Sequence, residues 1–188
     1  MKNIRILILL FTTTLFFIGC SNDDSDPLDP TSPASGISKL EFTSTGTFQN
    51  GSFVITDNPE SSSDRATGVL SNSDNVAVVT FADDNQGFTF MLMFPANKGT
   101  HQITEENIAH IQYLGNQIPV PDFFFQALSG TITITDLEHR NLLTGGGVIT
   151  RAKGSFNANL LGADFEAGED HTQNVSGNFD LYSYSTNE

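Results

Sequence analysis

From residue 37 to the C-terminus, short apolar runs alternate with clusters of glycine, asparagine, aspartate and serine. The clearest run, 130–136 (GTITITD), places isoleucine on one face of an extended chain and threonine on the other. The same period of two marks the segments 148–160 and 175–184. Because successive side chains of a strand point to opposite faces, these patterns predict half-buried β-strands.

Two further runs predict a β-hairpin. The segments 75–81 and 88–94 are rich in β-branched and aromatic residues, and the turn-forming segment 82–87 (ADDNQG) separates them. The second run is apolar at nearly every position, which indicates burial on both faces or a place beside a filled interior. Weaker patterns predict strands near 40–47, 48–56, 66–70 and 101–104.

The segment 104–114 (TEENIAHIQYL) fits two structures. Thr104 could cap a helix whose first turn carries Glu105 and Glu106. The stretch 109–113 fits a strand equally well, and we expect the strand.

These strands, joined by glycine-rich turns and without a long amphipathic helix, predict one all-β domain over 37–188. The expected architecture is an antiparallel β-sandwich. An up-and-down, lipocalin-like barrel is the alternative, because the same pattern of short strands suits a closed sheet.

The segment 1–19 has the plan of a cleaved secretory signal peptide. Lys2 and Arg5 supply a basic start, and the run 6–18 is apolar apart from three threonines. A retained transmembrane helix is the alternative. Such a helix needs about 20 apolar residues, whereas this run is shorter and polar residues follow it directly, so we expect cleavage.

The run ends at Cys20, the only cysteine of the chain. The segment 17–20 (FIGC) resembles a bacterial lipobox, although Phe17 stands where leucine is usual. The resemblance implies cleavage between Gly19 and Cys20 and a diacylglyceryl group on the thiol, which would hold the protein at a membrane without a spanning helix. A single cysteine also leaves the domain without a disulfide or a thiolate metal site.

The segment 20–36 is dense in aspartate, serine and proline, so we expect a solvated tether that holds the domain away from the membrane. Its acidic start resembles the surface-export signal of Bacteroidota-type lipoproteins. That resemblance implies a cell-surface lipoprotein of the outer membrane, with a periplasmic-facing anchor as the alternative. The residues that carry it are Asn22, Asp23, Asp24 and Asp26.

The chain is strongly acidic, with 22 acidic against 8 basic residues and a formal net charge of −14. Proteins bind nucleic acids by neutralising phosphates with lysine and arginine. This composition therefore excludes a nucleic-acid partner. It also argues against charge-driven adhesion to anionic lipid.

Residue types that could carry chemistry are few and scattered. No two of the four histidines (His101, His110, His139 and His171) have a metal-ligand spacing, so we expect surface histidines and no metal or cofactor. Two acidic stretches could bind a cation, or in the second case act as acid and base, but we expect a hairpin turn and a solvated loop. These stretches are Asp83–Gly87 and the group Glu166, Glu169, Asp170 and His171.

Three consecutive phenylalanines, Phe123–Phe125, must place at least one ring on the opposite face from its neighbours if they form a strand. We expect burial against the interior or a second sheet; an exposed apolar contact site is the alternative. Stacking on sugar is a further hypothesis for the three tyrosines Tyr113, Tyr182 and Tyr184.

The order of the strand motifs in the second half resembles small Bacteroidota-type lipoproteins with a β-domain of unknown function. The motifs are GTHQI (99–103), SGTITIT (129–135), KGSF (153–156) and VSGNFD (175–180). His101 and Ser155 depart from the family pattern, and the resemblance transfers no active site.

Since no acid, base and nucleophile come together in a known pattern, we expect a binding or structural module rather than an enzyme. The rival hypotheses are a carrier that encloses a small apolar ligand among Phe88, Phe90 and Phe124, and a glycan-binding accessory lipoprotein.

Overall fold

A computed structural model describes residues 36–57, 64–71, 75–83, 86–115, 122–142, 146–164 and 168–182. The predicted signal peptide, the predicted lipid attachment site at Cys20 and the predicted acidic tether lie outside these ranges. The predictions made for them therefore stay predictions.

The described residues form ten β-strands, and the predicted all-β class is confirmed. The strands are β1 (Ser38–Gly46), β2 (Gly51–Asp57), β3 (Asp64–Ser71), β4 (Val76–Asp83), β5 (Phe88–Pro95), β6 (Gly99–Ile103), β7 (His110–Gly115), β8 (Phe123–Asn141), β9 (Gly147–Asp164) and β10 (Glu169–Tyr182).

All strands belong to one antiparallel sheet with the order β2-β1-β10-β9-β3-β4-β5-β7-β8-β6, and β9 also pairs with β8. The strands β9, β3, β4, β5, β7 and β8 therefore form a closed circuit of hydrogen-bonded neighbours. The order is not that of a simple up-and-down barrel, because β5 pairs with β7 and β6 pairs with the far half of β8.

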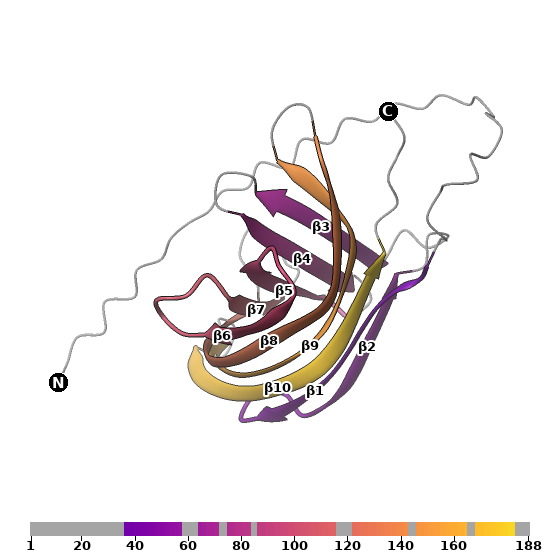
Figure 1. Cartoon of the computed structure of the whole chain (residues 1–188). Coiled ribbons are helices and arrows are strands. Elements are labelled where there is room, and N and C mark those ends of the chain that lie inside the picture. Colours follow the sequence, from indigo (N-terminus) through magenta and orange to yellow (C-terminus); the bar gives the residue numbers. More distant parts are fainter. Residues whose placement is uncertain are drawn as a thin grey trace. The chain divides into compact units, whose positions relative to one another are not determined.

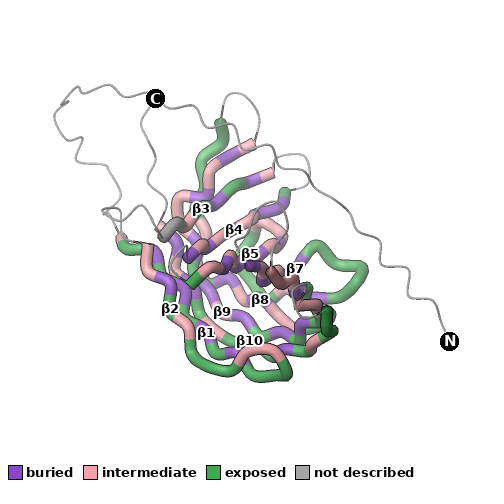
Figure 2. Tube along the Cα trace, turned by 180° about the vertical axis from the view of Figure 1, so that it is seen from behind, coloured by how far each residue is buried: buried purple, intermediate pink, exposed green. Residues whose placement is uncertain are grey.

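Within the β-domain the sheet folds into two facing layers (Figure 1). The strands β3, β4, β5 and β7 form one layer, and the long curved strands β8, β9 and β10 continue into β1 and β2 as the other. Buried and exposed residues alternate along the long strands (Figure 2), so one face of this layer covers the core and the other faces solvent.

Bulges and a glycine allow β8 to bend. Its register with β9 shifts at three places, between Ala127 and Ser129, between Ile134 and Asp136, and between Glu138 and His139. Such bulges increase local twist and bend a strand. Gly130 has a φ of 143°, a conformation that residues with a Cβ rarely adopt.

The core is built mainly from aromatic rings that connect the two layers. Phe42 of β1 lies 4.9 Å from Phe90 of β5 and 5.9 Å from Tyr113 of β7, measured between ring centroids. Phe90 in turn lies 5.1 Å from Phe156 of β9. Aromatic pairs at these separations add to the stability gained from burial.

The hairpin predicted from 75–81 and 88–94 is confirmed, since β4 and β5 pair with Phe81 opposite Phe90. The second run is fully buried on one face only, and its other face, which carries Met91 and Met93, is half-buried. The helix considered for 104–114 does not form; 105–108 is a turn and the strand β7 starts at His110.

Phe123–Phe125 lie at the start of β8, as the strand interpretation required. Phe125 is fully buried, and the Phe123 and Phe125 rings both pack against Tyr113. Phe124 faces the other way and is half-buried. The prediction of burial against the interior is thus confirmed for Phe125, while Phe123 is half-buried and packs against the core from the same face.

Replacing Phe90 by alanine should remove ring contacts to both layers and leave a cavity between them. We expect Phe90→Ala to lower the free energy of unfolding by about 3–5 kcal/mol, as is typical of buried phenylalanine. Urea unfolding followed by circular dichroism measures this loss. The exposed Val69 of β3 provides the control: Val69→Ala should change the same quantity by less than about 0.5 kcal/mol, and an equal loss in both variants would contradict the assigned role of Phe90.

Candidate functional site

The four histidines lie on four different strands: His101 on β6, His110 on β7, His139 on β8 and His171 on β10. His101 Nε2 hydrogen-bonds the carbonyl oxygen of Asn97 at 3.0 Å. Burial lowers the pKa of His110 below its ordinary value. Across the described ranges, no three histidine, cysteine, aspartate or glutamate side chains gather in a way that could hold a metal ion.

The acidic cluster near the start of β10 is only partly described, because Glu166 lies outside the described residues. His171 packs against the ring of Phe48 at 5.5 Å and its Nδ1 hydrogen-bonds Thr47 Oγ1 at 3.2 Å. A carboxylate oxygen of Glu169 lies 3.9 Å from His171 Nε2. These contacts attach the imidazole to the loop between β1 and β2, which is a structural use of the ring.

The stretch considered for calcium begins with Asp83, whose carboxylate is engaged within the turn. The backbone N–H of Gln86 donates to Oδ1 at 2.9 Å, and the Gln86 side-chain amide donates to Oδ2 at 2.6 Å. Gly87 follows with a φ of 72° and donates its N–H to the carbonyl oxygen of Asp83. The predicted hairpin turn is confirmed at these residues.

Tyr113 cannot act as a stacking platform, because its ring is fully buried in the aromatic core and its hydroxyl donates to Gln49 Oε1 at 2.5 Å. Burial raises the pKa of Tyr113 well above its ordinary value. The Tyr182 ring carries the Arg151 guanidinium at 3.8 Å from its centroid. Tyr184 lies outside the described residues.

The rings that the carrier hypothesis places around a ligand cavity are closely packed against other rings. Phe88 lies 5.2 Å from Tyr113, and Phe90 contacts three aromatic neighbours at 4.9–5.9 Å. Phe124, the third residue of that hypothesis, faces away from them. Rings in mutual contact fill space rather than enclose a ligand, so this packing disfavours the carrier hypothesis.

The outward face of the long layer differs from these sites because its side chains are polar and mostly uncharged. Three consecutive rows run across β6, β8, β9, β10 and β1, and within these five strands they consist of hydroxyl and amide side chains with the single exception of Glu41. In cross-strand order the rows are Ser129–Asn159–Asn174–Thr45, then Gln102–Thr131–Asn157–Ser176–Thr43, then Thr100–Thr133–Ser155–Asn178–Glu41. We call these rows the hydroxyl–amide face. On β2 the third row continues to the exposed Val54.

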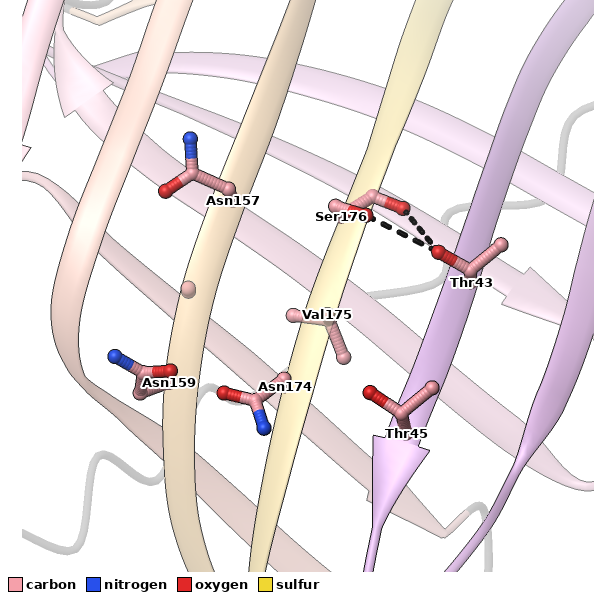
Figure 3. A pocket seen from close by; sticks show the side chains of 8 residues that line it. Thr43, Thr45, Asn157, Asn159, Asn174, Val175 and Ser176 are labelled. Carbon is pink, nitrogen blue, oxygen red and sulfur yellow. Dashed lines mark hydrogen bonds between the residues drawn. The ribbon is translucent and has the colours of Figure 1, made fainter.

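Cross-strand hydrogen bonds order several of these side chains. Asn157 Nδ2 donates to Thr131 Oγ1 at 2.9 Å. Asn159 Nδ2 donates to Ser129 Oγ at 3.1 Å. The hydroxyl groups of Thr43 and Ser176 lie 3.1 Å apart (Figure 3).

A shallow depression of about 210 Å³ lies on this face, across the outward residues of β9, β10 and β1. Asn157 and Asn159 reach it from β9, and Asn174 reaches it from β10 (Figure 3). Each amide that already donates one hydrogen bond retains a second N–H and an acceptor oxygen, so this group can both donate to and accept from a ligand.

Charged side chains form a separate row at one end of the face. Asp180 of β10 pairs with Arg151, and with Lys153 Nζ at 3.4 Å. Lys98 Nζ lies 2.8 Å from Asp136, and the hydrogen bond from Lys98 is the main cause that lowers the pKa of Asp136. This row therefore holds three basic side chains against two acidic ones, and it lies at the margin of the hydroxyl–amide face.

This face was not predicted from the sequence, although the sequence contains one signal for it. The alternation in 130–136 places Thr131 and Thr133 outward, and Asn157 and Asn159 show the same period in β9. The cross-strand register that aligns these positions into rows could not be obtained from the sequence.

No family model, curated protein or solved structure matches this chain. Among the residues that the structure describes, no helix is long and apolar enough to cross a membrane.

The lowered pKa of His110 predicts a pH dependence of stability. As the pH falls through about 6.5, the unfolded chain binds a proton at this histidine and the folded chain resists doing so, which costs stability. Substituting His110 with glutamine should therefore reduce the loss of unfolding free energy between about pH 7.5 and pH 5.5. Urea midpoints at the two pH values test this, with the exposed His139→Gln as control. A loss unchanged by His110→Gln would contradict the assignment.

Proposed function

We propose that this protein is an exported lipoprotein, held at the outer membrane by lipid on Cys20, whose β-domain is a binding or structural module. The observation that carries the proposal is the position of the only cysteine. Cys20 directly follows Gly19 and an apolar run that a basic start precedes. In an exported protein, a lipidated thiol would no longer be free to oxidise or to form unwanted disulfides.

The construction of the domain supports this proposal. A chain whose one cysteine carries lipid must be stabilised without a disulfide, and here the aromatic core between the layers provides the stabilisation. Several described side chains of types that could do chemistry, among them Asp83, Asp180 and His171, are engaged in a turn, an ion pair or a ring contact. A binding or structural role therefore suits the domain better than catalysis.

The acidic run after Cys20 favours the outer face of the outer membrane as the location. The run contains Asp23, Asp24 and Asp26, and three prolines follow it before residue 36. Proline-rich segments are semi-rigid and extended, so such a tether would hold the domain clear of the membrane surface.

Lipidation can be tested by growing cells with an alkyne-bearing palmitate and detecting the label on the purified protein. We expect the wild type to be labelled and Cys20→Ala to be unlabelled, because the thiol is the attachment point. Ser32→Ala, a substitution within the same tether, should remain labelled. Label on Cys20→Ala, or its absence from the wild type, would sink the proposal.

Surface exposure can be tested by protease treatment of intact cells. The wild type should be degraded, and the triple variant Asp23→Ala, Asp24→Ala and Asp26→Ala should be protected until the outer membrane is broken. A control with Glu105→Ala and Glu106→Ala, which removes acidic charge from an exposed turn of the domain, should behave as the wild type. Protection of the wild type itself would place the domain on the periplasmic side.

A further inference from the structure

The hydroxyl–amide face stands out because only one of its side chains is charged, on a strongly acidic protein. The chain has a formal net charge of −14, yet the three rows contain one charged residue, Glu41, at their edge. The neighbouring charged row, with three basic and two acidic side chains, lies outside these rows. The groups that the rows themselves offer to a ligand are almost all neutral hydrogen-bond donors and acceptors, which suits a neutral polar ligand.

The dimensions of the face also restrict its partner. Five strands about 4.8 Å apart and three rows about 6.7 Å apart span roughly 19 Å by 13 Å. Each partner of a standard protein–protein interface contributes about 800 Å², which is about three times this area. The face suits a narrow chain more than the broad surface of a globular protein.

The chemistry of the rows matches a polyhydroxylated chain. Hydroxyl and amide groups both donate and accept hydrogen bonds, and the hydroxyl groups of a sugar do the same. The cross-strand hydrogen bonds of Asn157 and Asn159 hold these amides in place before any ligand arrives, which lowers the entropy cost of binding.

An apolar pair borders the rows at the end opposite the ion pairs. Leu161 of β9 is 43% exposed and lies opposite Gln126, and Leu128, at the first bulge of β8, is 47% exposed. Sugar rings carry apolar C–H faces as well as hydroxyl groups, so leucines beside polar rows provide both kinds of contact.

We propose that the hydroxyl–amide face binds a neutral glycan chain, with Asn157, Asn159 and Asn174 as its main hydrogen-bonding residues. This proposal deepens the proposed function, because an anchored, exported domain meets such polymers outside the cell. Each hydrogen bond replaces one with water and contributes little by itself. One site binds weakly, and many copies anchored in one membrane bind a polymer together.

The test uses the full-length lipidated protein in liposomes and measures co-sedimentation with insoluble neutral polysaccharides: cellulose, mannan and starch granules. Pectin and chitosan serve as the anionic and cationic comparisons. We expect at least one neutral polymer to retain the liposomes and the two charged polymers to retain few. The triple variant Asn157→Ala, Asn159→Ala and Asn174→Ala should reduce the retained fraction about tenfold.

A matched control removes polar side chains from the other layer: Thr67→Ala and Thr80→Ala should retain the wild-type binding. Thermal unfolding shows whether each variant folds, and the single variant Asn159→Ala provides a milder test on the same face. A folded triple variant that binds like the wild type, or a protein that no neutral polysaccharide retains, would overturn the glycan proposal. Self-association of the wild type that the triple variant abolishes would also overturn it, in favour of a second copy of the chain.

The result of the polysaccharide experiment can be distinguished from the result of the lipid experiment. If palmitate labels Cys20 and no polysaccharide is bound, the lipoprotein proposal stands and the glycan proposal fails. If the thiol carries no lipid, binding to the polysaccharide panel can still be measured with the full-length protein in detergent micelles.

Discussion

The contact of aromatic rings with glycines on neighbouring strands sets the geometry of the long layer. A Cβ added at Gly154 would lie 2.9 Å from the Phe179 ring, and one added at Gly162 would lie 2.7 Å from the Phe125 ring. At each glycine the ring and a backbone carbonyl oxygen of a neighbouring strand together occupy the space that a side chain would fill, a packing that reinforces strand register. Without a disulfide in the domain, this packing and the ring contacts between layers hold the sheet together.

The alignment of polar side chains on the outer face is a consequence of the packing of the inner face. Because side chains alternate, a slip of one residue in register would move the buried rings of β9 and β10 into solvent. Burial of Phe156 and Phe179 thus fixes the pairing of β9 with β10. That pairing in turn places Asn157 beside Ser176, so solvent-exposed polar residues from distant parts of the sequence form continuous rows.

Local alternation made individual strands predictable, whereas their arrangement depended on long-range contacts. The period of two around Ile132 and Ile134 predicted both a strand and its buried face, and both residues are buried. The placement of β6 against β8 left no local signal, because it depends on pairings such as Thr100 with Thr133. For the same reason the hydroxyl–amide face was missed, and the tyrosine hypothesis assumed exposure of Tyr113 that tertiary packing removes.

The first described residues of the chain are held against the end of β10. Gly36 lies against Tyr182 so closely that a Cβ there would be 2.5 Å from the ring, and Ser38 Oγ donates to the carbonyl oxygen of Tyr182 at 2.8 Å. The described chain thus enters the domain at the end of β10 that carries the ion pairs. Thr172, the cross-strand neighbour of Leu161, lies ten residues back along β10 from Tyr182. The hydroxyl–amide face therefore occupies the part of the long layer between the ion pairs, beside which the chain enters, and the two exposed leucines.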